Sequence, residues 1–247
     1  MHKLIYPYAI QLFKDRDLAI IEQCMNSLGD LIALTRLSVP KCGIDENMLH
    51  ELDKAITTNW RLCSLFYEQV PKFAVYYRSI VYFLDSIICK YSNAIYSLKE
   101  PMAYCFCKLV IHSPSKSDYI RTFASKYAYS SSCVLRQSYI ILIETSTRIV
   151  SKKFFMENFY KDFIQLENDK VLNVLFAYCK AIKSLLCKFY GEKVTEELYA
   201  ILKRISHRKK NKELSRVNTL SVSTPKKLFT PLNMNTHPTL RTLQSRT

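Results

Sequence analysis

Cysteine and histidine are the residue types in this chain that best fit metal binding or nucleophilic chemistry. The chain has nine cysteines and five histidines, and a structural zinc site needs four such ligands, usually as two closely spaced pairs. Cys105 and Cys107 form half of that pattern. Two residues apart on a helix they face different directions, and no second Cys/His pair lies at zinc spacing. We therefore expect core thiols in a reducing compartment and no metal site.

Carboxylates and glycines also give no indication of a catalytic centre. Asp45-Glu46 and Glu196-Glu197 lie where helices are expected to begin, and there their charge favours the helix dipole. Loops that cradle phosphate and turns that present a nucleophile need several glycines. This chain contains only three, at positions 29, 43 and 191. We therefore expect a non-catalytic protein without a cofactor.

Positive charge is concentrated at the C-terminal end of the chain. The net charge is +15, and residues 203–247 contribute +10 of it, because eleven Lys or Arg residues are opposed there by Glu213 alone. Apolar periodicity stops after Ser206, and the remaining sequence is rich in Ser, Thr, Asn and Pro. We predict a folded domain over residues 1–206 and a disordered basic tail over residues 207–247. Because the folded part is only mildly basic, we do not expect it to bind nucleic acid.

The tail begins with a basic run formed by Arg208, Lys209, Lys210 and Lys212. Such a run is typical of a nuclear-import signal, of a patch that binds an anionic surface, or of a solvated helix end. Cations are favourable at a helix C-terminus, which accounts for Lys203 and Arg204 but not for the rest of the run. These three interpretations remain open at this point.

A second group of tail motifs concerns phosphorylation. Residues 226–231 (KKLFTP) resemble a cyclin-docking sequence beside a proline-directed site at Thr230, and Thr224 precedes another proline. Phosphate on either threonine would lower the charge of the tail by about 1.5–2 units. We therefore expect phosphorylation to weaken electrostatic contacts that the tail makes.

The elements that must position any site are helices. Apolar residues recur at three- and four-residue steps through the folded part, which indicates amphipathic helices, and no alternating strand pattern is sustained. The expected pairs are 4–13 with 20–32, 45–56 with 60–70, 76–91 with 97–111, 118–126 with 133–150, and 154–166 with 171–187, followed by one helix over 194–206. No apolar run reaches the roughly 18 residues that a membrane helix needs. We expect a soluble protein of the cytoplasm or nucleus.

The spacing of the helix pairs predicts their architecture. Equivalent points near the starts of the second helices are separated by 39, 38, 37 and 39 residues; they are Glu22, Arg61, Lys99, Arg136 and Leu175. A steady period near forty with two helices per repeat is typical of HEAT and armadillo solenoids. We predict an all-α solenoid of about five helix pairs with one capping helix, whose second helices form the concave face. The alternative is an irregular helical bundle.

Several motifs in the repeats are similar to those of a known family. They are NWRLC at 59–63, EQVPKF at 68–73, RQ at 136–137, FFMENF at 154–159 and a DKVxNV pattern at 169–174. On these motifs, residues 45–187 resemble the HEAT-repeat regulatory and scaffold subunits of serine/threonine protein phosphatases of type 4 and type 2A. The chain departs from that family at Leu175, where the family's Asn-Val-Arg motif ends in arginine, and in being much shorter.

The resemblance implies a regulatory subunit that binds a phosphatase catalytic subunit and positions it. It points to a contact surface or turn ridge made by Trp60, Arg61, Arg136, Asp169, Lys170 and Asn173. An alternative is an adaptor for transport or the cytoskeleton, unrelated to phosphatases, that binds an anionic partner through its tail. Nucleic-acid binding by the tail is a third hypothesis.

The candidate ridge residues also have structural interpretations. Asp169 is placed to cap a helix that begins at Lys170, and Asn173 to hydrogen-bond a neighbouring turn. The two arginines are placed to pair with carboxylates one repeat away. This set therefore either holds adjacent repeats together or docks a partner. Trp60 is either a binding hot spot or a cover over a repeat boundary.

Overall fold

The computed structural model describes residues 8, 11–12, 15, 17–38, 59–74, 80–113, 115–189 and 193–207. The chain divides into two compact units, Met1–Arg208 and Lys209–Thr247, and all described residues belong to the first. Within them every regular element is a helix, and no strand is found.

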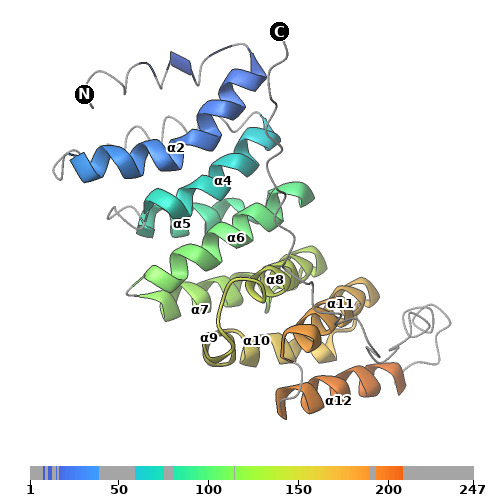
Figure 1. The fold of residues 1–247 in the computed structure, drawn as a ribbon. Helices are drawn as coiled ribbons and strands as arrows, with labels where there is room; N and C mark the ends of the chain where they lie inside the picture. Colours follow the sequence, from blue (N-terminus) through green and yellow to red (C-terminus); the bar gives the residue numbers. More distant parts are fainter. Residues whose placement is uncertain are drawn as a thin grey trace, which may run out of the picture. The chain divides into compact units, whose positions relative to one another are not determined.

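The helices follow one another as short antiparallel pairs (Figure 1). In chain order they are α2 (Leu18–Ser38), α4 (Trp60–Ala74), α5 (Ile80–Lys90), α6 (Tyr96–His112), α7 (Lys116–Tyr127), α8 (Cys133–Ser146), α9 (Lys152–Asn158), α10 (Tyr160–Gln165), the 3₁₀ helix η1 (Leu166–Asn168), α11 (Leu172–Lys188) and α12 (Lys193–His207). These elements confirm the predicted all-α, solenoid-like fold. The first helices expected at 4–13 and 45–56 lie almost wholly outside the described residues.

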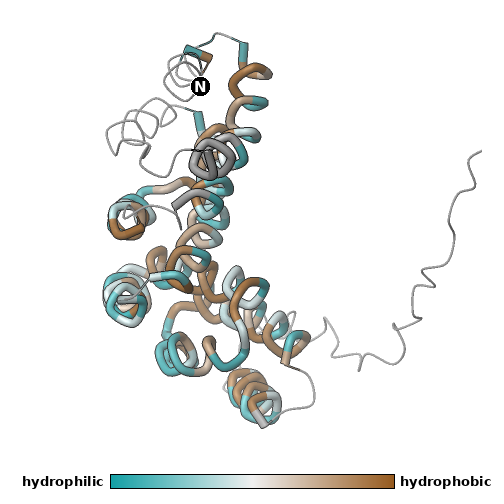
Figure 2. Tube along the Cα trace, turned by 60° about the vertical axis from the view of Figure 1, so that its left-hand side comes forward, coloured by the Kyte–Doolittle hydropathy of each residue, from teal (hydrophilic) through white to brown (hydrophobic). Residues whose placement is uncertain are grey.

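The second helices of successive pairs form one continuous layer. Helix α2 packs on α4, α4 on α6, α6 on α8, and α8 on α11, and Figure 1 shows them in that order. We call this stack the second-helix layer. The described helices carry both hydrophobic and hydrophilic residues around their turns (Figure 2), so each can bury one face against its neighbours.

Short polar side chains define where several of these helices begin. The first N–H groups of a helix have no partner within it, and an Asp, Asn or Ser just before the helix accepts from them. Asp17 accepts from the N–H of Ala19 at 2.9 Å. Asn59 does the same for Arg61 at 3.0 Å, and Ser151 accepts from the N–H of Phe154 at 3.2 Å.

One local prediction was wrong. The single helix expected over 154–166 is divided at Phe159, whose φ of −118° departs from helical geometry; the buried rings of Phe155 and Phe159 lie 6.1 Å apart across that point. A proline, Pro101, lies inside α6, which begins at Tyr96. Pro101 therefore lies in the second turn, where its missing N–H leaves the carbonyl of Ser97 without its helical partner.

Aromatic rings fill the centre of the described core. The Phe123 ring lies 4.7 Å from that of Phe106, 5.1 Å from that of Tyr91 and 4.4 Å from that of Tyr127. The two tyrosine hydroxyls donate to backbone carbonyls, Tyr91 to Ser138 at 3.0 Å and Tyr127 to Ile88 at 2.8 Å. Because both hydroxyls are satisfied, this cluster gains apolar contact without leaving those buried polar groups unpaired.

A lysine is buried beside this cluster. Lys99 is 6% exposed, its ammonium donates to the hydroxyl of Ser138, and it lies 5.7 Å from the centre of the Tyr91 ring. Burial lowers the pKa of Lys99, because a charged amine loses hydration when it is removed from water. Lys99 thereby joins α6 to α8, one repeat apart.

The expectation of core thiols holds for only part of the described cysteines, because Cys89 and Cys187 are exposed. Cys105 and Cys107 are fully buried, and burial raises the pKa of both thiols. This confirms the prediction that they are core residues.

None of the described helices is long and apolar enough to cross a membrane.

The aromatic cluster provides a test of the core. Replacing Phe123→Ala should lower the free energy of unfolding by about 3–5 kcal/mol, because it opens a cavity among rings that cannot fully collapse. Chemical denaturation followed by circular dichroism measures this change. Tyr96→Ala, at a side chain that is 77% exposed, should change it by no more than about 0.5 kcal/mol. Equal effects of the two substitutions would contradict this packing.

Candidate functional site

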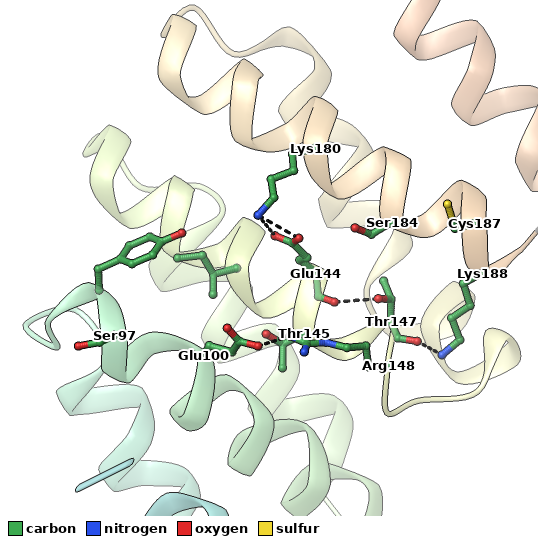
Figure 3. Close-up of a pocket in the computed structure, with 12 residues that line it drawn as sticks. Ser97, Glu100, Glu144, Thr145, Thr147, Arg148, Lys180, Ser184, Cys187 and Lys188 are labelled. Carbon is green, nitrogen blue, oxygen red and sulfur yellow. Dashed lines mark hydrogen bonds and ion pairs between the residues drawn. The ribbon is translucent and has the colours of Figure 1, made fainter. Parts of the chain in front are cut away.

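A groove runs across the second-helix layer. It consists of two adjoining hollows, of about 760 Å³ and about 860 Å³. Four residues line both hollows, namely Ser97, Glu100, Thr145 and Arg148. Together the hollows are lined from α4, α6, α8 and α11, and we call them the second-helix groove; Figure 3 shows the hollow between α6, α8 and α11.

Ion pairs and hydrogen bonds cross the groove from one repeat to the next. Arg148, just beyond α8, pairs with Glu100 of α6, and Lys180 of α11 pairs with Glu144 of α8 at 3.2 Å. The dashed lines in Figure 3 follow these contacts. The side chains of Arg148 and Glu100 are 62% and 58% exposed, and exposed pairs of this kind contribute only about 0–1 kcal/mol. A charged ligand can therefore replace one partner of such an ion pair at little cost in free energy.

Lys188 closes the end of α8. Its ammonium donates to the carbonyl oxygen of Thr147 and to that of Val150, the latter at 2.7 Å. Thr147 is the residue that follows α8, and Val150 lies in the turn beyond it. A cation at this place offsets the negative end of the helix dipole. Burial lowers the pKa of Lys188.

The residues predicted from the sequence lie elsewhere, at the N-terminal ends of the second helices. Trp60, the first residue of α4, is 46% exposed. The guanidinium of Arg61 lies 5.5 Å from the centre of its ring, and no ion pair of Arg61 is found among the described residues. Lys170 and Asn173, near the start of α11, are also exposed. None of these side chains lines the groove.

Arg136 and Asp169 form the ion pair that joins the fourth and fifth repeats. Two guanidinium nitrogens of Arg136 donate to the two carboxylate oxygens of Asp169, at 2.5 Å and 3.0 Å. A third nitrogen donates to the carbonyls of Ser130 and Ser131, at 2.8 Å and 2.9 Å. The Asp169 side chain is 3% exposed. The predicted pairing of Arg136 with a carboxylate one repeat away is confirmed.

Asp169 also organises the turn before α11, although not quite as predicted. Its carboxylate accepts from the N–H of Val171 at 2.8 Å, while α11 begins at Leu172 rather than at Lys170. Burial raises the pKa of Asp169, but the hydrogen bonds from Arg136 and the backbone lower it by more, so the pKa lies below its usual value. The hydrogen bond predicted for the Asn173 side chain is not found within the described part of the chain.

The cap of the stack is held in a similar way. Arg204 of α12 makes a bidentate contact with Glu167, at 2.7 Å and 2.8 Å, and Tyr160 donates to Glu197 at 2.5 Å. Arg204 lies in the last turn of α12, as expected for a cation at a helix end, and it also forms an ion pair with Glu167. The tail residues singled out from the sequence lie outside the described residues: Arg208, Lys209, Lys210, Lys212, Thr224 and Thr230.

The groove itself was not predicted. Its charged side chains belong to helices about forty residues apart, and each helix alone shows them only as an ordinary solvated face. A signal was nevertheless present, because Glu144 of α8 and Arg148 just beyond α8 are four residues apart, and Lys180 and Lys188 lie two turns apart on α11. Aligning the polar faces of successive second helices, as well as their apolar faces, would have revealed it.

The described residues contain no group of three or more His, Cys, Asp or Glu side chains that would hold a metal ion. The groove lining combines ammonium, guanidinium, carboxylate and hydroxyl groups from several repeats. Such groups suit recognition of a polar or charged chain.

Comparison with known proteins found no match to a protein-family model, to a curated protein or to a solved structure. The repeat architecture therefore rests on the structure itself.

The Arg136–Asp169 pair should be a strong contributor to stability. Asp169→Ala would leave the half-buried Arg136 without its carboxylate, and breaking such a pair typically costs about 3 kcal/mol or more. Urea denaturation measures the loss. The matched control is Asp118→Ala, which removes a pair with Arg121 that is 64% and 79% exposed and should cost at most about 1 kcal/mol. Similar losses from both variants would show that Asp169 does not lock the repeats.

The lowered pKa of Asp169 predicts an acid-sensitive contribution to stability. Its stabilisation is present in full above the unfolded-state pKa, about 3.9, and is lost as the pH falls through the lower folded-state pKa. The gap in unfolding free energy between wild type and Asp169→Asn should therefore narrow from pH 7 to about pH 2–3. Denaturation series at several pH values measure it, and a gap that stays constant would contradict the assignment.

Proposed function

We propose that this chain is a non-catalytic regulatory or scaffold subunit that binds a serine/threonine protein phosphatase catalytic subunit and positions it. The observation that carries the proposal is the second-helix groove, which extends over four consecutive second helices. A surface assembled from several repeats can hold an extended partner over many weak contacts. Holding a catalytic subunit elsewhere on the same stack would raise its effective concentration near a substrate bound in the groove.

The motifs that resemble phosphatase subunits divide into two sets in the structure. Arg136 and Asp169 are engaged with each other, which supports a role in joining repeats. Trp60, Arg61, Lys170 and Asn173 are exposed at the starts of α4 and α11. A half-exposed tryptophan with an arginine stacked on it is the composition typical of binding hot spots. We therefore assign Trp60 and Arg61 as contact residues for the catalytic subunit.

Binding to purified catalytic subunits of type 4 and type 2A phosphatases tests this proposal. The full chain is immobilised, and the dissociation constant is measured for the wild type and for a Trp60→Ala, Arg61→Glu variant. We expect wild-type binding and a loss of about 30-fold in the variant, the effect of removing one hot spot worth about 2 kcal/mol.

The matched control is Tyr199→Ala with Lys203→Glu, which removes an exposed aromatic ring and an exposed cation from α12. It should bind as the wild type does. Absence of wild-type binding to either catalytic subunit would overturn the phosphatase proposal. Binding that survives the α4 variant would instead show that the contact residues are wrong.

A further inference from the structure

Of the five cations that line the groove, four lie at equivalent positions, one from each of four consecutive second-helix segments. They are Lys72, Lys108, Arg148 and Lys188. The steps between them are 36, 40 and 40 residues, close to the repeat length, so each occupies an equivalent place near the C-terminal end of its helix. We call these four residues the cation ladder. Charges placed regularly along a groove can bind one elongated ligand at several points.

The ladder cations keep hydrogen-bonding capacity for a ligand. An arginine has five N–H donors and a lysine three. Among the described residues, one donor of Arg148 is bonded to Glu100 and two of Lys188 to carbonyls. Lys72 is 3.9 Å from a carboxylate oxygen of Asp30, and its side chain is 47% exposed. Lys108 lies 5.6 Å from the centre of the Tyr104 ring, a contact that leaves its charge in place.

Carboxylates alternate with the cations and narrow the class of ligand. Glu68 and Glu144 lie one turn before Lys72 and Arg148, and Glu100 lies between them on α6. A nucleic acid carries a phosphate at every nucleotide and would be repelled by these three carboxylates. A polypeptide can place its acidic residues at intervals, with uncharged residues between them. The mixed lining therefore favours a peptide over a continuous polyanion.

The spacing of the ladder fits an extended chain. Packed helices lie about 8–10 Å apart, so the four cations extend over about 24–30 Å. An extended polypeptide advances about 3.3 Å per residue, so acidic residues at every third position would span about 30 Å over four positions. Hydroxyl and carboxylate side chains that line the groove, such as those of Ser97 and Glu100, provide hydrogen-bond partners for the uncharged residues of the ligand.

We propose that the second-helix groove binds an extended, acidic segment of a partner protein, with a carboxylate at about every third residue opposite Lys72, Lys108, Arg148 and Lys188. This deepens the proposed function by naming the chemistry of the bound segment, and it rests on that proposal only in taking the groove as a protein-binding surface. The ladder sits on α4, α6 and α11 and just beyond α8, apart from the Trp60–Arg61 contact.

Fluorescence anisotropy with the full chain and a labelled synthetic peptide tests the proposal. The probe is a four-fold repeat of Glu-Ser-Ala, compared with the same peptide carrying Gln in place of Glu. We expect the acidic peptide to bind, the Gln peptide to bind at least about tenfold more weakly, and the affinity to fall with added salt, since exposed charge contacts are screened.

Variants of the chain locate the binding site. Lys72→Gln with Arg148→Gln should weaken binding of the acidic peptide by about tenfold, as expected for two lost charge contacts. The matched control, Arg121→Gln with Lys153→Gln, removes two cations that are 79% and 85% exposed on α7 and α9 and should bind as the wild type does. Circular dichroism and thermal unfolding confirm that both variants fold.

Three results would overturn the proposal. They are equal binding of the two peptides, equal weakening by the ladder and control variants, and tighter binding of single-stranded DNA of similar length than of the acidic peptide. The outcome is separate from the phosphatase test. Peptide binding without catalytic-subunit binding would support the proposed ligand of the cation ladder and contradict the phosphatase proposal. Catalytic-subunit binding without peptide binding would support the phosphatase proposal and contradict the proposed ligand.

Discussion

Each helix pair can bury its apolar faces only against the pairs next to it, and the rest of the structure depends on that constraint. The second helices stack in sequence from α2 to α11, and the main contacts between described helices are made within a repeat or with a neighbouring one. Stability in such a stack is a sum of repeat and interface contributions. Polar side chains at the interfaces then decide how firmly each repeat holds the next. The Arg136–Asp169 and Glu167–Arg204 pairs do this at the C-terminal end.

Much of the fold was predictable because the same helical spacing of apolar residues recurs in every repeat. Apolar residues at helical spacing located the second helices, and short polar side chains such as Asp17 mark where some of them begin. The boundary of α11 was misplaced because Asp169 bonds to the N–H of Val171 rather than starting a helix at Lys170. Local sequence does not distinguish those two uses of a carboxylate. The division of the helix at Phe159 was also missed, since it depends on how several rings pack together.

The candidate site was harder to predict than the fold. Of the residues chosen from the sequence, Arg136 and Asp169 proved to bind each other, while Trp60 and Arg61 lie exposed at the start of α4. The groove depends on side chains such as Glu100 and Arg148, which are 48 residues apart and come together only when the repeats stack. No pattern within a single helix contains that information. It appears when equivalent positions of successive repeats are compared.

Lys188 has a consequence that extends beyond the groove it lines. The same ammonium that faces the groove holds the carbonyls of Thr147 and Val150 at the end of α8. A ligand carboxylate that draws Lys188 toward itself would compete with those carbonyls, and loss of their partner would favour fraying of that helix end. Occupancy of the groove and local opening of α8 are then linked equilibria, and linkage is reciprocal. Ligand binding at Lys188, in one repeat, would therefore shift the local opening equilibrium at the end of α8, in the repeat before it.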